Sequence, residues 1–226
     1  MGMSEILRER NPRGHGSKLR DEILLAATDL IEETGSEQAV TLRAVARRVG
    51  ISAPSIYAHF PDREAIVGAI IDGAFTDFNA AIYAATEGVG PADPLRRLRA
   101  GCEAYLRFAA DRPERYRLLF ERGTPHPTGT PVPGVRTESF GWLVAALQDC
   151  ISVGISASDD AARDATVIWA ALHGYATLHS LIPGFPWPDS EVMLDRIVSG
   201  PGQIGHSQIG HSRVGHSQVG HSQITG

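Results

Sequence analysis

The sequence is poor in cysteine: it has two in 226 residues, Cys102 and Cys150, so at most one internal disulfide can form. Both lie in apolar segments with a helical period, and we expect buried free thiols in a reducing compartment. No basic segment followed by an apolar one opens the chain, and no run of 18 apolar residues occurs in it. These absences predict a cytoplasmic protein with no membrane partner.

The sequence also lacks the residue patterns that enzyme chemistry requires. It contains no His-Glu-x-x-His, Gly-x-Ser-x-Gly or Cys-x-x-Cys pattern and no glycine loop that would cradle a phosphate. His173 and His179 are separated by about 240° around a helix, so they cannot chelate a metal ion from one face. We therefore expect no enzymatic activity and no cofactor.

Charge is distributed unevenly along the chain, which holds 21 Lys and Arg, 26 Asp and Glu, and a net charge of -5. Residues 1–63 hold 9 basic and 9 acidic side chains, so residues 64–226 hold the remaining 12 and 17. Because a nucleic-acid-binding domain is usually basic as a whole, composition alone argues weakly against one. The local arrangement of the basic residues must decide.

Hydrophobic periodicity predicts helices along the chain and gives no strand signal. Glycine, proline and capping residues set the expected helix ends. The expected helices cover residues 17–34, 42–49, 52–60, a longer stretch after Pro61-Asp62, and then 95–112, 114–121, 137–153, 159–181 and 190–199. Residues 123–134 hold four prolines and three glycines, which predict an irregular loop, and residues 1–16 a flexible arm. The expected fold is all-α.

The segment TLRAVARRVGISAPSIYAHF, residues 41–60, predicts a helix-turn-helix with its tight turn at Gly50. Its apolar positions can form one small core, and its polar side chains remain outside on the two helices. Hydroxyl, phenol, imidazole and guanidinium groups suit contacts to phosphates and base edges. The expected inward residues are Leu42, Val45, Ala46, Val49, Ile51, Ile56 and Phe60, packed on Ile23, Leu30 and Ile31. The expected outward residues are Arg43, Arg47, Arg48, Ser52, Ala53, Ser55, Tyr57 and His59.

Residues 17–77 resemble the DNA-binding domain of the TetR family of transcriptional regulators. The motif residues that carry the resemblance are Thr41, Ala46, Gly50, Tyr57, Phe60 and Asp62-Arg63; the family more often has lysine where this chain has Arg63. By position, the resemblance implies phosphate contacts from Thr41, Tyr57, His59 and Arg63, and places Arg43, Ser52, Ala53 and Ser55 nearest the base edges.

Simpler readings of the same residues stay open. Tyr57 can pack against the domain, His59 can cap a helix end, and the whole segment can be a three-helix bundle that uses a tight turn. Arg47 and Arg48 are more plausible as solvated charges than as base readers. Arg43 is the best candidate for a guanine contact, because serine and alanine specify bases poorly.

Residues 78–200 are expected to form a C-terminal helical bundle for ligand binding and dimerisation. Trp169, His173 and Gly174 resemble the Trp-His-Gly signature of one TetR subgroup. The resemblance implies a homodimer on a palindromic double-stranded operator and a ligand-responsive repressor, although the residues do not separate repressor from activator. Apolar faces suited to dimerisation are expected at Trp142, Leu143, Leu147, Ala165, Trp169 and Leu172.

A ligand pocket is expected among the aromatic residues of this bundle. With few charges, it would take an apolar or aromatic small molecule whose identity the sequence does not give. The same aromatic residues can also be ordinary core. The expected lining residues are Tyr105, Phe108, Tyr116, Trp142, Trp169 and His173.

Residues 201–226 contain a five-residue unit, QIGHS and its variants, whose period matches neither a helix nor a strand. We expect a disordered tail. An alternative function is metal binding or metal sensing by the histidines that recur in this tail. These are His206, His211, His216 and His221.

Overall fold

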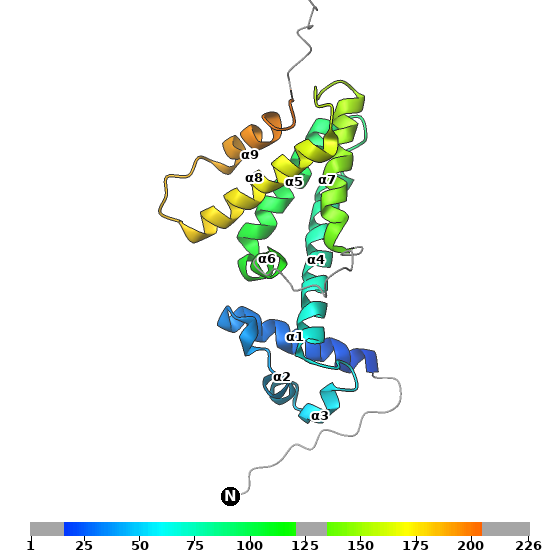
Figure 1. The fold of residues 1–226 in the computed structure, drawn as a ribbon, viewed down its shortest axis with the longest axis vertical. Coiled ribbons are helices and arrows are strands. Elements are labelled where there is room, and N and C mark those ends of the chain that lie inside the picture. Colours follow the sequence, from blue (N-terminus) through cyan, green and yellow to red (C-terminus); the bar gives the residue numbers. More distant parts are fainter. Residues whose placement is uncertain (1–15, 121–134, 205–226) are drawn as a thin grey trace, which may run out of the picture.

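The computed structural model describes residues 16–120 and 135–204 (Figure 1). Every regular element within these ranges is a helix, apart from one isolated bridge between Ser156 and Ile204. The elements that precede the long helix α4 (Arg63–Glu87) gather at one end of it, and the helices that follow it lie around its other end (Figure 1). The prediction of an all-α fold is confirmed.

The N-terminal part is built from α1 (Gly16–Thr34), a 3-10 turn η1 (Glu37–Ala39), α2 (Leu42–Val49) and α3 (Ala53–Ile56). Gly35 and Gly50 end α1 and α2 with φ of 63° and 75°, a left-handed conformation that costs glycine little. Thr41 caps α2, since its hydroxyl accepts a hydrogen bond from the Ala44 amide at 3.1 Å. The capping pattern read from the sequence is therefore confirmed.

The expected inward residues of this part do form its core. The fully or nearly fully buried members are Ile23, Ile31, Val45, Ala46, Ile56 and Phe60. The partly buried members packed against them are Leu30, Leu42, Val49 and Ile51. Two short helices and a tight turn become stable here because they share this core with α1.

Helix α3 is shorter than expected, ending at Ile56 and not at Phe60. The Ile56 carbonyl accepts hydrogen bonds from both the His59 amide at 2.8 Å and the Phe60 amide at 2.9 Å. The chain therefore tightens into a turn after one helical turn, and Tyr57 and His59 lie on that turn.

Helix α4 (Arg63–Glu87) begins at Asp62, whose carboxylate accepts from the Ala65 amide at 2.7 Å. It is long and apolar enough to cross a membrane by length and composition, but half of its most apolar window is buried against other helices, as in a core helix. The expected domain boundary at residues 77 and 78 falls inside this helix. One unbroken helix therefore joins the two parts of the chain (Figure 1).

The C-terminal part contains α5 (Pro94–Asp111), α6 (Pro113–Phe120), α7 (Val135–Ser152), α8 (Ala161–Leu181) and α9 (Ser190–Ser199). All five bounds agree with the sequence-based expectation to within two residues. Asp160 caps α8 by accepting from the Arg163 amide at 2.9 Å. Cys102 and Cys150 are free and buried, as predicted. The irregular loop expected at residues 123–134 lies outside the described residues.

The start of the expected tail is docked on this bundle. The Gly202 carbonyl accepts from the Ser156 hydroxyl at 2.5 Å, and the Gln203 side chain donates to the buried Asp164 carboxylate at 3.2 Å. Gln203 adopts a left-handed φ of 49°, which is uncommon outside glycine and is held by these contacts. Residues 201–204 thus belong to the folded domain, and the rest of the expected tail lies outside the described residues.

Gly202→Ala is expected to lower the free energy of unfolding by about 1–2 kcal/mol, the usual cost of inserting a methyl group into a packed site. A Cβ at this position would clash with the Val198 carbonyl oxygen. Urea unfolding at fixed protein concentration measures the change. Gly184→Ala is the matched control, because its Cβ would meet nothing within 4 Å. Equal midpoints for the two variants would contradict this prediction.

Candidate DNA-contacting face and ligand cavity

Helices α2 and α3 present one polar face. Tyr57 is 58% exposed, so its ring lies outside the core and the packing interpretation does not describe it. Arg43 and Thr41 are exposed on α2 and at its cap, and Ser52 lies exposed before α3. Ser55, Ala53 and His59 are half-buried. The Ser52 and Ser55 hydroxyls are 2.7 Å apart and hydrogen-bond to each other.

The arginines of α2 differ in what they contact. Arg48 donates to Glu33 on α1, with its Nη1 2.8 Å from Glu33 Oε2, and it also lies 3.6 Å from Asp29. The hydrogen bond with Glu33 raises the pKa of Arg48 and lowers that of Glu33. Arg48 is therefore a surface ion-pair partner, in line with its expected role as a charge that reads no base. Arg43 and Arg47 are exposed.

Arg63 is engaged inside the protein. Its Nε donates to the Val40 carbonyl at 2.9 Å, and its Nη2 donates to the Glu37 carbonyl at 2.8 Å and the Glu37 carboxylate at 3.0 Å. Glu37 is 5% exposed. The first residue of α4 is thus tied to the turn that precedes α2. The phosphate contact expected of Arg63 stays a prediction, since it would have to use the remaining donors of the guanidinium.

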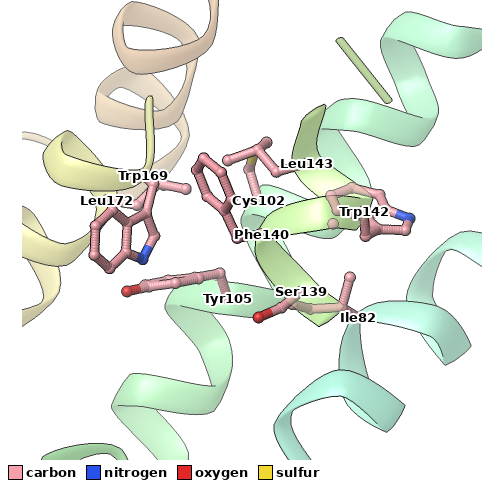
Figure 2. Close-up of a pocket in the computed structure, with 10 residues that line it drawn as sticks. Ile82, Cys102, Tyr105, Ser139, Phe140, Trp142, Leu143, Trp169 and Leu172 are labelled. Atoms are coloured by element: carbon pink, nitrogen blue, oxygen red, sulfur yellow. The ribbon is translucent and has the colours of Figure 1, made fainter. Parts of the chain in front are cut away.

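The expected ligand-binding residues fall into two neighbouring cavities. Tyr105, Trp142 and Trp169 line the first, together with Ile82, Cys102, Ser139, Phe140, Leu143 and Leu172 (Figure 2). Tyr116 and His173 line the second. Each has a free volume of about 20 Å³, roughly the size of one water molecule.

Phe108 lines neither of these two cavities, and its role in ligand binding stays a prediction. It is 4% exposed and packs edge-on against Phe78 with ring centroids 5.2 Å apart. Its position on the inner face of α5 predicts burial but does not distinguish a cavity wall from filled core.

A chain of hydrogen bonds links the two cavities. The Tyr105 and Tyr116 hydroxyls are 2.9 Å apart, and the Tyr116 hydroxyl lies 2.8 Å from His173 Nδ1. Burial raises the pKa of Tyr116 to about 12 and raises that of Tyr105 further, with a hydrogen bond from Trp169 opposing the rise. Trp169 and His173, one helical turn apart on α8, therefore hold tyrosines from α5 and α6. Both phenols remain neutral hydrogen-bonding groups at physiological pH.

Sequence reasoning missed Phe140 in the first cavity and Phe120 in the second. Phe140 packs edge-on against Trp169 with centroids 6.1 Å apart. Phe120 lies 4.9 Å from the His173 ring and 5.0 Å from the Tyr116 ring, again between centroids. Phe120 is the last residue of a short helix, so no periodicity marked it as central.

The faces expected to form the dimer require correction. Trp142, Leu143, Leu147, Ala165 and Leu172 are 0–8% exposed within a single chain, and only Trp169, at 37%, reaches the surface. Helical periodicity identified their apolar faces but could not say that α4, α5 and α9 of the same chain cover them. The outer face of α8 is apolar and uncovered instead, with Val167, Leu178 and Leu181 at 46–60% exposure. A Cβ added at Gly174 on the same helix would meet no atom of the described residues within 4 Å.

The chain combines a helix-turn-helix with a second helical domain that contains an aromatic cavity, and the long helix α4 joins the two. This combination defines a two-domain helix-turn-helix protein. Comparison with known proteins agrees with this class. Residues 23–70 match the family described as bacterial regulatory proteins, tetR family, and residues 98–199 match the tetracyclin repressor-like C-terminal domain. The chain belongs to the TetR family. The Trp-His-Gly subgroup stays a prediction.

Individual relatives fit this assignment. The chain is 29% identical over 116 residues to the HTH-type transcriptional regulator EthR of Mycolicibacterium smegmatis, covering 49% of this chain and 53% of that protein. It is 29% identical over 125 residues to the transcriptional activator FasR of the same organism, covering 50% and 54%. It thus spans about half the length of these curated relatives. A structure of a Rhodococcus protein of unknown function is 27% identical, with a TM-score of 0.74 over 88% of this chain and all of the other.

Proposed function

We propose that this protein is a transcriptional regulator that binds double-stranded operator DNA as a homodimer and responds to a small molecule. The observation that carries the proposal is the polar face of α2 and α3, on which Tyr57 is 58% exposed and Arg43 and Thr41 are also exposed, on a well-packed helix-turn-helix. An exposed phenol on a domain whose core is otherwise complete has no role in packing. Such a face suits phosphate and base-edge contacts in the major groove.

The proposed dimer would use the outer face of α8. One four-residue reading helix makes few contacts, whereas two related by a two-fold axis can enter successive major grooves about 34–36 Å apart. Val167, Leu178 and Leu181 give α8 an exposed apolar stripe, and Gly174 would let a second helix approach closely. The net charge of -5 does not oppose this proposal, because only the two DNA-contacting faces of the dimer, one on each protomer, need to be positive.

The proposed effector is an apolar or aromatic small molecule that enters the first cavity. Its wall is almost entirely aromatic and aliphatic, with the Tyr105 and Ser139 hydroxyls among its polar groups (Figure 2). The cavity would have to widen for such a ligand, and Phe140 and Trp169, which keep surface exposure, are the walls best able to move. A ligand shifts the equilibrium between two conformations of the regulator only if it binds them with different affinities.

A regulator that binds the chromosome of a bacterium acts in the cytoplasm, which is where we place it.

The metal-sensing alternative is not favoured by the described residues, among which no group of three or more metal-ligating side chains occurs. The four tail histidines lie outside those residues.

The proposal predicts different effects for two variants of the DNA-contacting face formed by α2 and α3. Arg43→Ala is expected to weaken binding by about 1–3 kcal/mol at its preferred base pair and to relax preference there. Tyr57→Ala, which removes a phosphate contact, is expected to weaken binding at every sequence alike. Gel-shift titration against a duplex selected from random DNA, and against duplexes with single base changes, measures both effects.

Arg107→Ala is the control for this pair, since Arg107 lies on α5 in an exposed ion pair with Glu103, far from the reading face in sequence and fold. It is expected to bind like the wild type. Equal binding by the wild type, Arg43→Ala and Tyr57→Ala would overturn the proposed DNA-contacting face.

A further inference from the structure

The first cavity is closed on most sides by buried side chains. Those that are only 1–8% exposed are Ile82, Cys102, Tyr105, Trp142, Leu143 and Leu172. Trp169 on α8 is 37% exposed, and Ser139 and Phe140 on α7 are half-buried. Within the part of the chain that the structure describes, a molecule from solvent therefore reaches this cavity between α7 and α8, past these three side chains.

Trp169 is the fixed side of this entrance. Its indole N–H donates to the Tyr105 hydroxyl. Its ring also packs against Phe120 and His173, with centroids 6.4 Å and 6.2 Å apart. A rotation of the indole would break the hydrogen bond and both ring contacts, so Trp169 keeps one orientation.

Phe140 is the side of the entrance that can move. Its ring packs edge-on against Trp169 with centroids 6.1 Å apart, and this is its one aromatic contact among the described residues. Figure 2 shows the ring between the side chains of Trp169 and Cys102. A phenyl ring has no hydrogen bond to lose, and a change of its χ1 rotamer requires no movement of the backbone.

The backbone of α7 beside Phe140 is tied to α4. The Arg136 guanidinium lies 2.8 Å from the Asp72 carboxylate. The Glu138 carboxylate accepts from the Tyr83 hydroxyl at 3.1 Å. Both contacts start from the first turns of α7, so the Phe140 side chain can turn while the helix that carries it stays in place.

We propose that Phe140 is a side-chain gate of the first cavity: its ring turns away from Trp169, the effector enters between α7 and α8, and the ring closes behind it. Because the interior is closely packed, the space that the ring leaves is that of one phenyl group. The entrance therefore selects molecules whose cross-section is no larger than a single aromatic ring. This inference deepens the proposed function, on which its biological meaning rests, by naming the route and the size class of the effector.

The gate remains accessible in the proposed dimer. Trp169 and Leu178 are separated by about 180° around α8. A second copy that covers the outer face of α8 at Leu178 therefore leaves the side that carries Trp169 open to solvent.

The two cysteines of the chain can report on this gate. Cys102 lines the cavity and is 1% exposed, whereas Cys150 is 0% exposed and is not among the residues that line it. Burial raises the pKa of Cys102 to about 12 and that of Cys150 to about 11. Because the thiolate is the reactive form, acidity alone would make Cys150 the faster thiol. Faster labelling of Cys102 must therefore come from access.

The test measures how fast benzyl methanethiosulfonate, a single-ring thiol reagent, labels each cysteine of the folded full-length protein, with peptide mass spectrometry as the readout. In the wild type, Cys102 is expected to react at least about tenfold faster than Cys150, because a local opening is more frequent than global unfolding. Phe140→Ala is expected to speed labelling of Cys102 by about a further tenfold and to change that of Cys150 by less than about twofold. Phe140→Leu, a milder truncation, is expected to give an intermediate rate at Cys102.

A bulkier reagent tests the size limit. Diphenylmethyl methanethiosulfonate carries two rings on one carbon, and its rate is compared with its own rate on free cysteine. It is expected to label Cys102 of the wild type at least about tenfold more slowly than the benzyl reagent does, and to lose most of this difference in Phe140→Ala. Equal rates for the two reagents on the wild type would overturn the size selection.

Two control variants separate the gate from other openings. Phe185→Ala removes a ring that is 52% exposed on the connection between α8 and α9, and it is expected to label like the wild type. Glu138→Ala weakens the tie between α7 and α4 and is expected to change the Cys102 rate by less than about twofold. A Glu138→Ala effect as large as that of Phe140→Ala would show that α7 itself moves, and would overturn the side-chain gate.

Two further results would also overturn the gate: an unchanged Cys102 rate in both Phe140 variants, or an equal rise at Cys102 and Cys150. The labelling experiment requires neither operator nor effector. Failure of the proposed function would therefore show differently, as an absence of DNA binding with the labelling pattern intact.

Discussion

Gly101→Ala is expected to be the most damaging small substitution in the C-terminal domain, lowering the free energy of unfolding by about 3 kcal/mol, at the upper end for overpacking a core. A Cβ at Gly101 would overlap the Trp142 ring, lying 2.5 Å from Cζ3 and 2.6 Å from Cζ2. Trp142 is itself 8% exposed and has no room to retreat without disturbing the first cavity. Urea unfolding at one fixed protein concentration measures the loss.

Two further variants test the stated cause. Gly73→Ala, on an exposed position of α4 where a Cβ meets nothing within 4 Å, is expected to be neutral or stabilising by up to about 1 kcal/mol. Trp142→Leu should make room for the new methyl group, so the double variant Gly101→Ala/Trp142→Leu is expected to be less destabilised than the sum of its parts. Strict additivity would show that the two side chains do not compete for one space.

Arg63→Ala is expected to lower the free energy of unfolding by about 2–3 kcal/mol. The substitution leaves the buried Glu37 carboxylate without its guanidinium, and breaking a buried pair typically costs about 3–5 kcal/mol. We place the effect below that range because the Arg63 side chain is 28% exposed and solvent screens the pair. Denaturant unfolding followed by circular dichroism measures it.

Glu37→Gln supplies the decisive comparison. In the Arg63→Ala background it removes the buried charge that has lost its guanidinium, so the double variant is expected to recover most of the lost stability. A double variant no more stable than Arg63→Ala alone would mean that the carboxylate is not the source of the cost. Arg63→Lys, the residue commoner in the family, would retain a charge near Glu37 but lose the forked hydrogen bonds.

Local features of the fold could be predicted because the signals are local. Gly35 and Gly50 end helices in the left-handed conformation, and Thr41 and Asp62 begin them, all within four residues of the groups they cap. The end of helix α3 was the exception. The sequence predicted that it ends at Phe60, but the conformation of the single turn after Ile56 decides where the helix ends. The polar face of the helix-turn-helix followed from assigning the apolar positions inward.

Features that depend on distant partners could not be predicted. Arg63 and Glu37 are 26 residues apart, and no pattern joins them. The apolar faces of α7 and α8 were assigned to a dimer because periodicity shows that a face is apolar and does not show what covers it. The expected single pocket likewise became two cavities, since only the packing of Phe120 and Phe140 decides where space remains.

The central claim is that α2 and α3 read a two-fold symmetric DNA sequence. Selection from a random duplex library by the purified protein tests it most directly. We expect enrichment of a palindromic motif whose half-sites lie one or more helical turns apart, and we expect the Arg43→Ala/Tyr57→Ala protein to enrich nothing. Failure of the wild-type protein to enrich any motif over the input library would contradict the account.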